Sequence, residues 1–88
     1  MTVVLMELLT DQGNNAVVRL PDRNYPGVVI QGDTLNNLAG MALDAIDALG
    51  SGNADEAKAL VNELAEHLDA ARTRYEAALE ENGITLPY

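Results

Sequence analysis

Cysteine, tryptophan and phenylalanine are all absent from this chain of 88 residues. Without cysteine there are no disulfides, no thiol nucleophile and no cysteine-ligated metal, and the absence agrees with a reducing compartment. We therefore expect the protein to be cytoplasmic. The hydrophobic core has to be built from aliphatic side chains, because Tyr25, Tyr75 and Tyr88 are the only aromatic residues.

Long hydrophobic runs are absent as well. The stretch from Val3 to Leu9 is apolar, but Glu7 interrupts it and no basic segment precedes it, which argues against a secretory signal. No run approaches the roughly 20 apolar residues that a membrane helix requires. The apolar fraction of 48% still favours a folded chain over a disordered one. The length predicts one domain, residues 1–88.

Basic residues are few, with five Lys and Arg against 14 Asp and Glu, for a net charge of −9. Residues 1–32 carry a net charge of −1, whereas residues 33–88 carry −8, from eleven acids against Lys58, Arg72 and Arg74. This second part would repel phosphate backbones and anionic membrane surfaces, so we expect no direct binding to nucleic acid or membrane. A basic protein is the complementary partner.

Alternating apolar residues predict three strands, over about residues 2–10, 15–20 and 27–31. The first has apolar residues on both faces, which predicts a strand covered on both sides or one whose second face meets a partner. The turn sequence Asp11-Gln12-Gly13-Asn14 separates the first two strands, and Pro26-Gly27 precedes the third. A three-stranded antiparallel β-meander is the simplest arrangement.

Two helices are expected to follow, over about residues 34–49 and 54–82. Asp33 is the expected N-cap of the first helix, and Asn53 of the second, with Glu56 three residues on as in a capping box. The apolar residues expected to face the core are Leu35, Leu38, Ala39, Ala42, Ile46 and Leu49 on the first helix and Leu60, Leu64, Leu68, Ala71, Tyr75 and Leu79 on the second.

Glycines mark the predicted helix ends. Gly50 and Gly83 are expected to take the left-handed conformation beyond a C-terminus, with Ile84 folding back onto Leu79 in a Schellman ending. The second helix is longer than the first, so its far half has to pack on the sheet or on another subunit. The predicted fold class is α+β, a β-meander followed by a long αα-hairpin packed on one face.

Groups that carry chemistry are sparse. His67 is the only histidine, and with Glu63 it gives two ligands where a metal site needs three or four, so we expect no metal and no cofactor. Ser51, the only serine, lies in a Gly-Ser-Gly turn without an oxyanion-hole motif. We therefore expect no enzyme activity. Only the loop of residues 21–27 is placed to form a small-molecule pocket over the sheet.

Pro21-Asp22, Pro26-Gly27 and Gln31-Gly32-Asp33-Thr34 follow one another ahead of the first predicted helix. Over residues 21–46 the chain resembles the signature of HicB-type antitoxins, which enter their first helix from a partial ribonuclease-H-like sheet. The chain differs in having three residues between Asp22 and Pro26 where that family has one, and a long helix where it has a short link to a strand. As a whole it is more similar to a family of small bacterial proteins of unknown function that share residues 13–21.

Together these features favour a small acidic protein-binding module, antitoxin- or immunity-like, that occludes a basic protein partner. Tyr and Arg are enriched at binding hot spots, and acidic residues on helices would steer the encounter. The residues expected to bind the partner are Arg23, Tyr25, Asp44, Asp47, Glu63 and Glu66.

An alternative is a structural homo-oligomerisation module. The far half of the second helix would then form the seam of a homodimer, through Ala71, Tyr75 and Leu79. The two hypotheses are compatible with each other.

Overall fold

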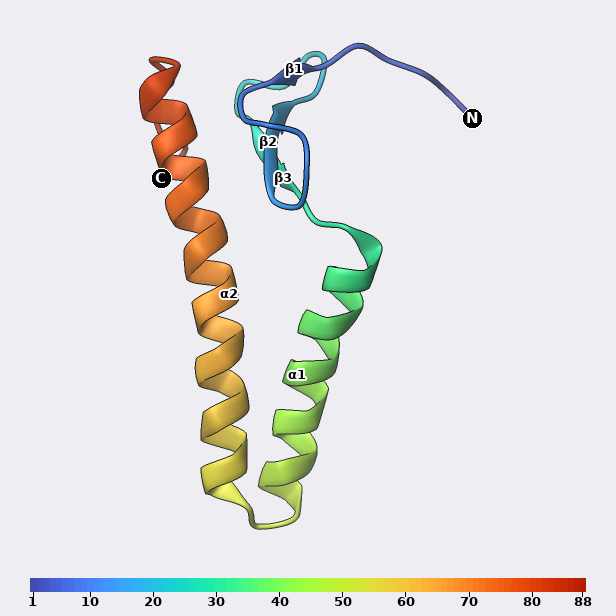
Figure 1. Cartoon of the computed structure of the whole chain (residues 1–88), viewed down its shortest axis with the longest axis vertical. Helices are drawn as coiled ribbons and strands as arrows, with labels where there is room; N and C mark the ends of the chain where they lie inside the picture. Colours follow the sequence, from blue (N-terminus) through green and yellow to red (C-terminus); the bar gives the residue numbers. More distant parts are fainter. The chain divides into compact units, whose positions relative to one another are not determined.

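A computed structural model describes residues 1–88 and contains a three-stranded sheet and two helices (Figure 1). The elements are β1 (Glu7–Leu8), β2 (Ala16–Arg19), β3 (Gly27–Val29), α1 (Gly32–Gly50) and α2 (Ala54–Glu81). An antiparallel sheet followed by two helices that pack against each other confirms the α+β prediction.

The chain forms two compact units. One, the sheet unit, consists of Met1–Ile30 and Ala71–Tyr88, and the other, the hairpin unit, consists of Gln31–Ala70. Helix α2 contributes to both, since its first part belongs to the hairpin and its last part to the sheet unit. Neither helix combines the length and the hydropathy that a membrane crossing requires.

The strands pair in the order β1-β2-β3, all antiparallel, as the meander prediction requires. Glu7 lies opposite Arg19, and their side chains form an ion pair at 2.6 Å. Strand β1 is much shorter than the predicted residues 2–10. Extending its register would set Leu5 opposite Pro21, which lacks an N–H. It would set Val4 opposite Asp22, whose φ is +63°. Neither residue can continue the ladder.

The segment before β1 is not covered on either side. Val3, Val4, Leu5 and Met6 are all exposed, between 47% and 91% of their surface. The expectation that this apolar stretch is buried on both faces within the chain is therefore wrong. The alternative, that one face meets a partner, stays a prediction.

The core of the sheet unit lies between one face of the sheet and the end of α2. Val17 and Leu79 are fully buried there, together with Tyr75 and Ala78. The half-buried residues packed against them are Leu9, Val28, Ile84 and Leu86. The far half of the second helix thus packs on the sheet, which was one of the two arrangements that its length allowed.

The predicted Schellman ending of α2 is confirmed. Gly83 has φ +67°, and its N–H donates to the Glu80 carbonyl at 3.1 Å, while the Ile84 N–H donates to the Leu79 carbonyl at 2.9 Å. Ile84 also packs against the cluster that contains Leu79. The bonds satisfy carbonyls that the helix end would otherwise leave open, and the hydrophobic contact accompanies them as this motif expects.

The hairpin unit packs through alanines. Ala45 and Ala48 of α1 and Ala57 of α2 are the buried residues, whereas Ile46 and Leu49 are each more than 60% exposed. The prediction that the Leu35–Leu49 stripe faces the core is therefore wrong for Leu35, Ile46 and Leu49, whereas Leu38 is half-buried. Alanine lets helix axes approach closely, and the packed arc of α1 is turned away from the stripe of large side chains.

The caps differ in part from the sequence expectation. Helix α1 begins at Gly32 after an extended Gln31 that makes no side-chain cap bond, so Asp33 is not the N-cap and its carboxylate accepts from the Thr34 N–H at 2.8 Å. Asn53 does cap α2, since its side-chain oxygen accepts from the Glu56 N–H at 3.2 Å.

The turn between the helices is closed by a glycine other than the expected one. Gly50 is the last residue of α1, and Gly52 takes the left-handed conformation with φ +76°. The Gly52 N–H donates to the Leu49 carbonyl at 3.1 Å and the Asn53 N–H to the Ala48 carbonyl at 2.8 Å. The helix therefore runs two residues further before its Schellman ending.

Candidate functional site

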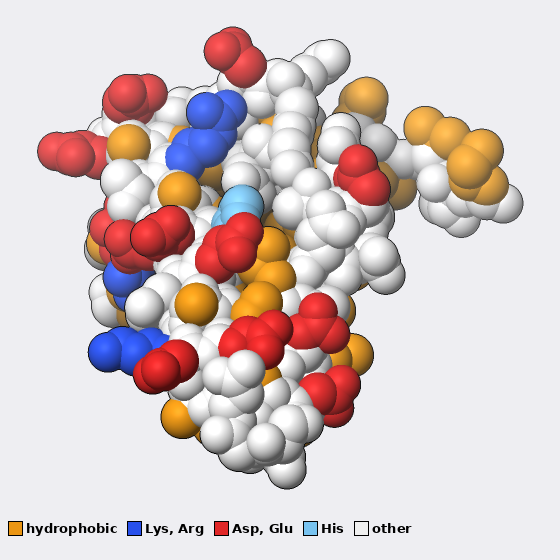
Figure 2. Space-filling model, turned by 60° about the horizontal axis from the view of Figure 1, so that its bottom comes forward, with side chains coloured by type: hydrophobic (Ala, Val, Ile, Leu, Met, Phe, Trp, Pro, Cys, Tyr) orange, Lys and Arg blue, Asp and Glu red, His pale blue; other side chains and the backbone are white.

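Acidic side chains of both helices converge where the hairpin turns. A hollow of about 310 Å³ opens there, which we call the acidic hollow, and its lining residues are Asp44, Asp47, Ala48, Ser51, Asn53, Glu56 and Leu60. Figure 2 shows the molecule from this end, with acidic side chains in red on either side of hydrophobic ones in orange. The lining of the hollow thus includes three carboxylates beside two apolar residues, Ala48 and the half-buried Leu60.

Local sequence explains how these carboxylates reach the turn. Asp44 and Asp47 are three residues apart on α1 and so share one side of that helix. Glu56 is held from α2 by Asn53, whose side-chain N–H donates to the Glu56 carboxylate at 3.0 Å. Because this contact joins Glu56 to the residue that caps α2, it directs the carboxylate towards the turn.

The two residues of the turn are engaged in its own bonds. The Ser51 hydroxyl donates to the Asp47 carbonyl at 3.0 Å, which closes the C-terminal turn of α1. The Asn53 side chain satisfies one of the free N–H groups of the first turn of α2, that of Glu56. These hydrogen bonds fix the ends of the two helices from which the three carboxylates project.

The field around the hollow is strongly negative. The hairpin unit contains eight acids against Lys58 alone, for a net charge of −7. Carboxylates accept short, charge-assisted hydrogen bonds from Lys and Arg, and the long apolar stems of those side chains pack on surfaces such as Ala48 and Leu60. The arrangement suits a cationic side chain. No group of three or more Asp, Glu and His side chains is placed to hold a metal ion.

The remaining acids that sequence reasoning selected lie further along α2. Glu63 is seven residues from Glu56, two helical turns on, and so lies on the same side of the helix. Glu66 is turned about 60° further round the helix, away from α1. Both are exposed. The structure therefore brings Asp44 and Asp47 together in one site, adds Glu56, and leaves Glu63 and Glu66 outside it.

Glu56 is the member of the site that sequence reasoning missed. Its role as a capping partner of Asn53 was predicted, but nothing in the spacing of residues 44, 47 and 56 shows that they meet. The three carboxylates meet because the turn between the helices is short. The sequence did not show this, because the turn is closed by Gly52 and not by Gly50. The signal was the capping pair itself, placed directly after two acids on the preceding helix.

Arg23 and Tyr25 lie in the sheet unit, in a groove of about 400 Å³. The groove is on the face of the sheet opposite to α2, because its strand residue Val18 alternates with the buried Val17. The lining residues are Met6, Val18, Leu20, Arg23, Tyr25, Pro26, Gly27, Val28 and Val29. The loop of residues 21–27 does form one wall of a pocket, and that pocket is mainly apolar.

Tyr25 does not fold back over the core, since 49% of its surface is exposed. Arg23 is the only charged residue that lines this groove. A groove of this kind offers contact area and one cation rather than a set of convergent catalytic groups.

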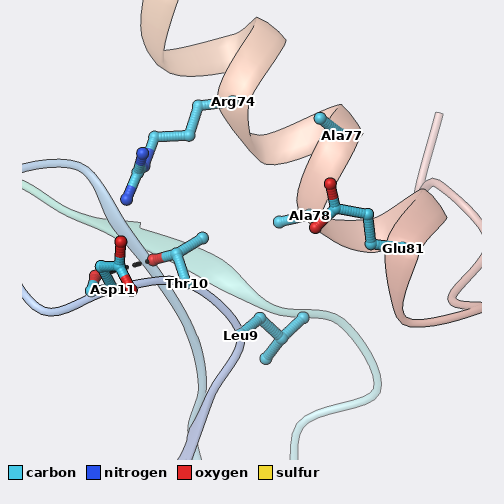
Figure 3. Close-up of a pocket in the computed structure, with 7 residues that line it drawn as sticks. All are labelled: Leu9, Thr10, Asp11, Arg74, Ala77, Ala78 and Glu81. Atoms are coloured by element: carbon cyan, nitrogen blue, oxygen red, sulfur yellow. Dashed lines mark hydrogen bonds between the residues drawn. The ribbon is translucent and has the colours of Figure 1, made fainter.

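A third hollow, of about 360 Å³, lies between the residue 10–11 loop and the end of α2 (Figure 3). Arg74 and Glu81 approach it from the helix, and Thr10 and Asp11 from the loop. The Thr10 hydroxyl is already used, because it accepts from the Val17 N–H and donates to the Asp11 carbonyl, both at 3.0 Å. The site contains charges of both signs and no pair of nucleophile and base.

The residues expected at a dimer seam are occupied within the chain. Leu79 is fully buried and Tyr75 is 8% exposed, both in the core of the sheet unit, and Ala71 is half-buried. Burial raises the pKa of the Tyr75 hydroxyl above its ordinary value of 10.0, and the nearby Tyr25 raises it further. These side chains therefore have a structural role that leaves little of them for a second copy.

Comparison with known proteins places the chain in a family. DUF6959, a family of unknown function, matches residues 1–88, so the chain belongs to it. This confirms the similarity to a family of unknown function that the sequence suggested. No curated protein and no solved structure matches the chain.

Proposed function

We propose that this member of the DUF6959 family is a small acidic protein-binding module that occupies a basic protein partner, in the manner of antitoxins and immunity proteins. The observation that supports it most is the acidic hollow, where Asp44, Asp47 and Glu56 line one cavity together with Leu60. A Lys or Arg side chain of the partner would enter this hollow with its stem on Leu60 and its charged head among the carboxylates.

Long-range charge supports the same partner. A net charge of −7 on the hairpin unit attracts a cationic surface before contact and raises the association rate. Glu63 extends the negative strip along α2 beyond the hollow. Inhibition in this proposal is steric, with the hairpin covering a basic functional surface of the partner.

The groove in the sheet unit supplies a second, apolar contact in this proposal. Tyr25 combines a half-exposed ring with a place at the rim of the groove, and aromatic residues of this kind anchor protein interfaces. The resemblance of residues 21–46 to the HicB-type signature includes this loop and supports an antitoxin-like role. Arg23 beside it would select an acidic or carbonyl-bearing contact on the partner.

Affinity capture from the source cell tests the proposal. The wild-type chain, carrying an affinity tag, is expected to retain a basic protein at low salt and to release it at high salt, because the contact is electrostatic. The double variant Asp44→Asn with Asp47→Asn is expected to lose most of the capture.

The matched control is the double variant Glu80→Gln with Glu81→Gln, which changes the net charge by the same amount in the sheet unit. It is expected to capture as wild type does. If both double variants lose capture equally, net charge alone explains the binding and the acidic hollow has no specific role. A captured partner that is acidic, or whose capture does not depend on salt, would contradict the proposal.

A further inference from the structure

The hairpin unit carries a broad apolar surface that its own core does not use. Six aliphatic side chains are each between 50% and 63% exposed, and they are Leu35, Leu43, Ile46 and Leu49 on α1 with Val61 and Leu68 on α2. We call these six residues the apolar face. Single exposed aliphatic residues are normal on a protein surface, but six in one unit of 40 residues call for a physical account.

Helix geometry places five of the six on one side of the hairpin, with Leu43 at the edge of this group and directed away from α2. At about 100° per residue, the exposed arc of α1 is turned roughly 125° from the arc of Ala45 and Ala48, in the direction of increasing residue number. On α2, Val61 and Leu68 are turned roughly 60° in the same sense from the packed arc, which consists of Ala57 and the half-buried Leu60 and Leu64. Because the helices are antiparallel, two rotations of the same sense lead to the same side of the pair.

The acids lie on the other side. Asp44 and Asp47 are turned from the packed arc of α1 in the opposite sense, and so is Glu56 on α2, which agrees with their meeting in one hollow. No acid lies within the apolar arcs of the two helices. The hairpin therefore has one anionic face and one aliphatic face.

We infer that the apolar face is the seam of a homodimer in which two hairpins pack as a four-helix bundle. The occupant is a second copy, because the face has no carboxylates to attract a basic partner and is complementary in kind only to another aliphatic surface. Ala39 and Ala42 lie among the large side chains of α1 and leave space for those of the second copy.

The area suits such a contact. The six side chains expose roughly 600 Å² on one chain, close to the roughly 800 Å² per partner that a standard interface buries once its polar rim is included. The only buried side chains of the hairpin are three alanines, which is little for a unit of this size, and oligomerisation is a usual remedy for so small a core.

Charge does not oppose the assembly. With the apolar faces in contact, the acidic faces of the two copies point outwards and lie about two helix diameters apart, roughly 20 Å. This exceeds the screening length of about 8 Å at physiological salt. The dimer would present two acidic hollows, one at each outer surface. The inference stands independently of the proposed partner, because the two faces do not overlap.

Sedimentation velocity of the purified chain across a range of concentrations tests the inference. The wild-type chain is expected to sediment as a dimer that dissociates on dilution. Ile46→Glu is expected to be monomeric at every concentration, because it buries a charge in the seam. Asn62→Glu adds the same charge on the outer side of α2, at an exposed position, and is expected to remain dimeric.

A second variant guards against loss of folding. Ile46→Ala keeps helix propensity and adds no charge, and it is expected to raise the dissociation constant of the dimer about tenfold or more. A wild-type chain that is monomeric at high concentration would overturn the inference. The inference would also be overturned if Ile46→Ala and Ile46→Glu both formed dimers as stable as the wild-type dimer, since the seam would then lie elsewhere.

Discussion

The Tyr75 hydroxyl donates a hydrogen bond of 2.9 Å to the carbonyl of Pro26, across 49 residues of chain. The bond is buried and joins the end of α2 to the loop that forms one wall of the groove. The loop is thus held from beneath by the core while Arg23 and Tyr25 remain available at its surface. A single hydrogen bond links the fold of the sheet unit to one of the two proposed contact sites.

Removing this bond should destabilise the sheet unit. Tyr75→Phe keeps the ring and leaves the Pro26 carbonyl without its donor in a buried place, which costs about 1–2 kcal/mol. Urea unfolding followed by circular dichroism measures the loss. Tyr88→Phe is the control, because the Tyr88 hydroxyl donates to the Glu76 carboxylate in an exposed hydrogen bond, and the midpoint of this variant should stay that of wild type. Equal midpoints for all three proteins would mean that the buried bond is unimportant.

The raised pKa of Tyr75 makes stability depend on alkaline pH. Burial holds the proton on this hydroxyl in the folded state, whereas the unfolded chain releases it near its ordinary pKa of 10.0. The contribution is therefore fully present below pH 10 and is lost as the pH rises through the folded pKa. Thermal unfolding from about pH 8 to about pH 11 should show a steeper fall of Tm for wild type than for Tyr75→Phe. Parallel curves would contradict this assignment.

Leu79 is the centre of the sheet-unit core, and shortening it should be costly. Leu79→Ala removes a fully buried side chain and is expected to cost about 2–5 kcal/mol of unfolding free energy. Leu20→Ala, at a position that is 44% exposed, is the control and should cost far less. Denaturant unfolding compares them. Similar losses at the two positions would show that Leu79 is not packed as described.

The two glycines of the hairpin turn should respond in opposite directions. Gly52 has φ +76°, where a Cβ is unfavourable, so Gly52→Ala is expected to cost about 1 kcal/mol or more. Gly50 is helical with open space around its Cβ position, so Gly50→Ala is expected to stabilise the chain by up to about 1 kcal/mol. The Tm of each variant is measured by thermal unfolding. A lower Tm for Gly50→Ala than for Gly52→Ala would indicate that Gly50, and not Gly52, closes the turn.

Local signals in the sequence were sufficient for much of this fold. The cap at Asn53 and the ending at Gly83 depend on residues within a few positions of one another, and both were predicted correctly. The order of strands and helices follows from alternation and helical spacing in the same way. The extent of β1 was not predictable from its own residues, because Pro21 and Asp22, which follow the neighbouring strand β2, end the pairing.

The packed face of α1 was not predictable for a related reason. Its apolar residues cover an arc of roughly 220°, and periodicity alone does not say which part of so wide an arc meets α2. The structure selects Ala45 and Ala48 and leaves Ile46 and Leu49 exposed. The acidic hollow was not predictable either, because Glu56 comes close to Asp44 and Asp47 only once the turn between the helices has formed.

The most direct test of the central claim is a binding titration with the purified partner obtained by capture. The dissociation constant is measured at low and at high salt for wild type, for Asp44→Asn with Asp47→Asn, and for Glu80→Gln with Glu81→Gln. We expect wild type and the Glu80 and Glu81 variant to bind alike at low salt, and the Asp44 and Asp47 variant to bind at least tenfold more weakly and with less dependence on salt. Equal affinities and equal salt dependence for the three proteins would contradict a cationic contact at the acidic hollow.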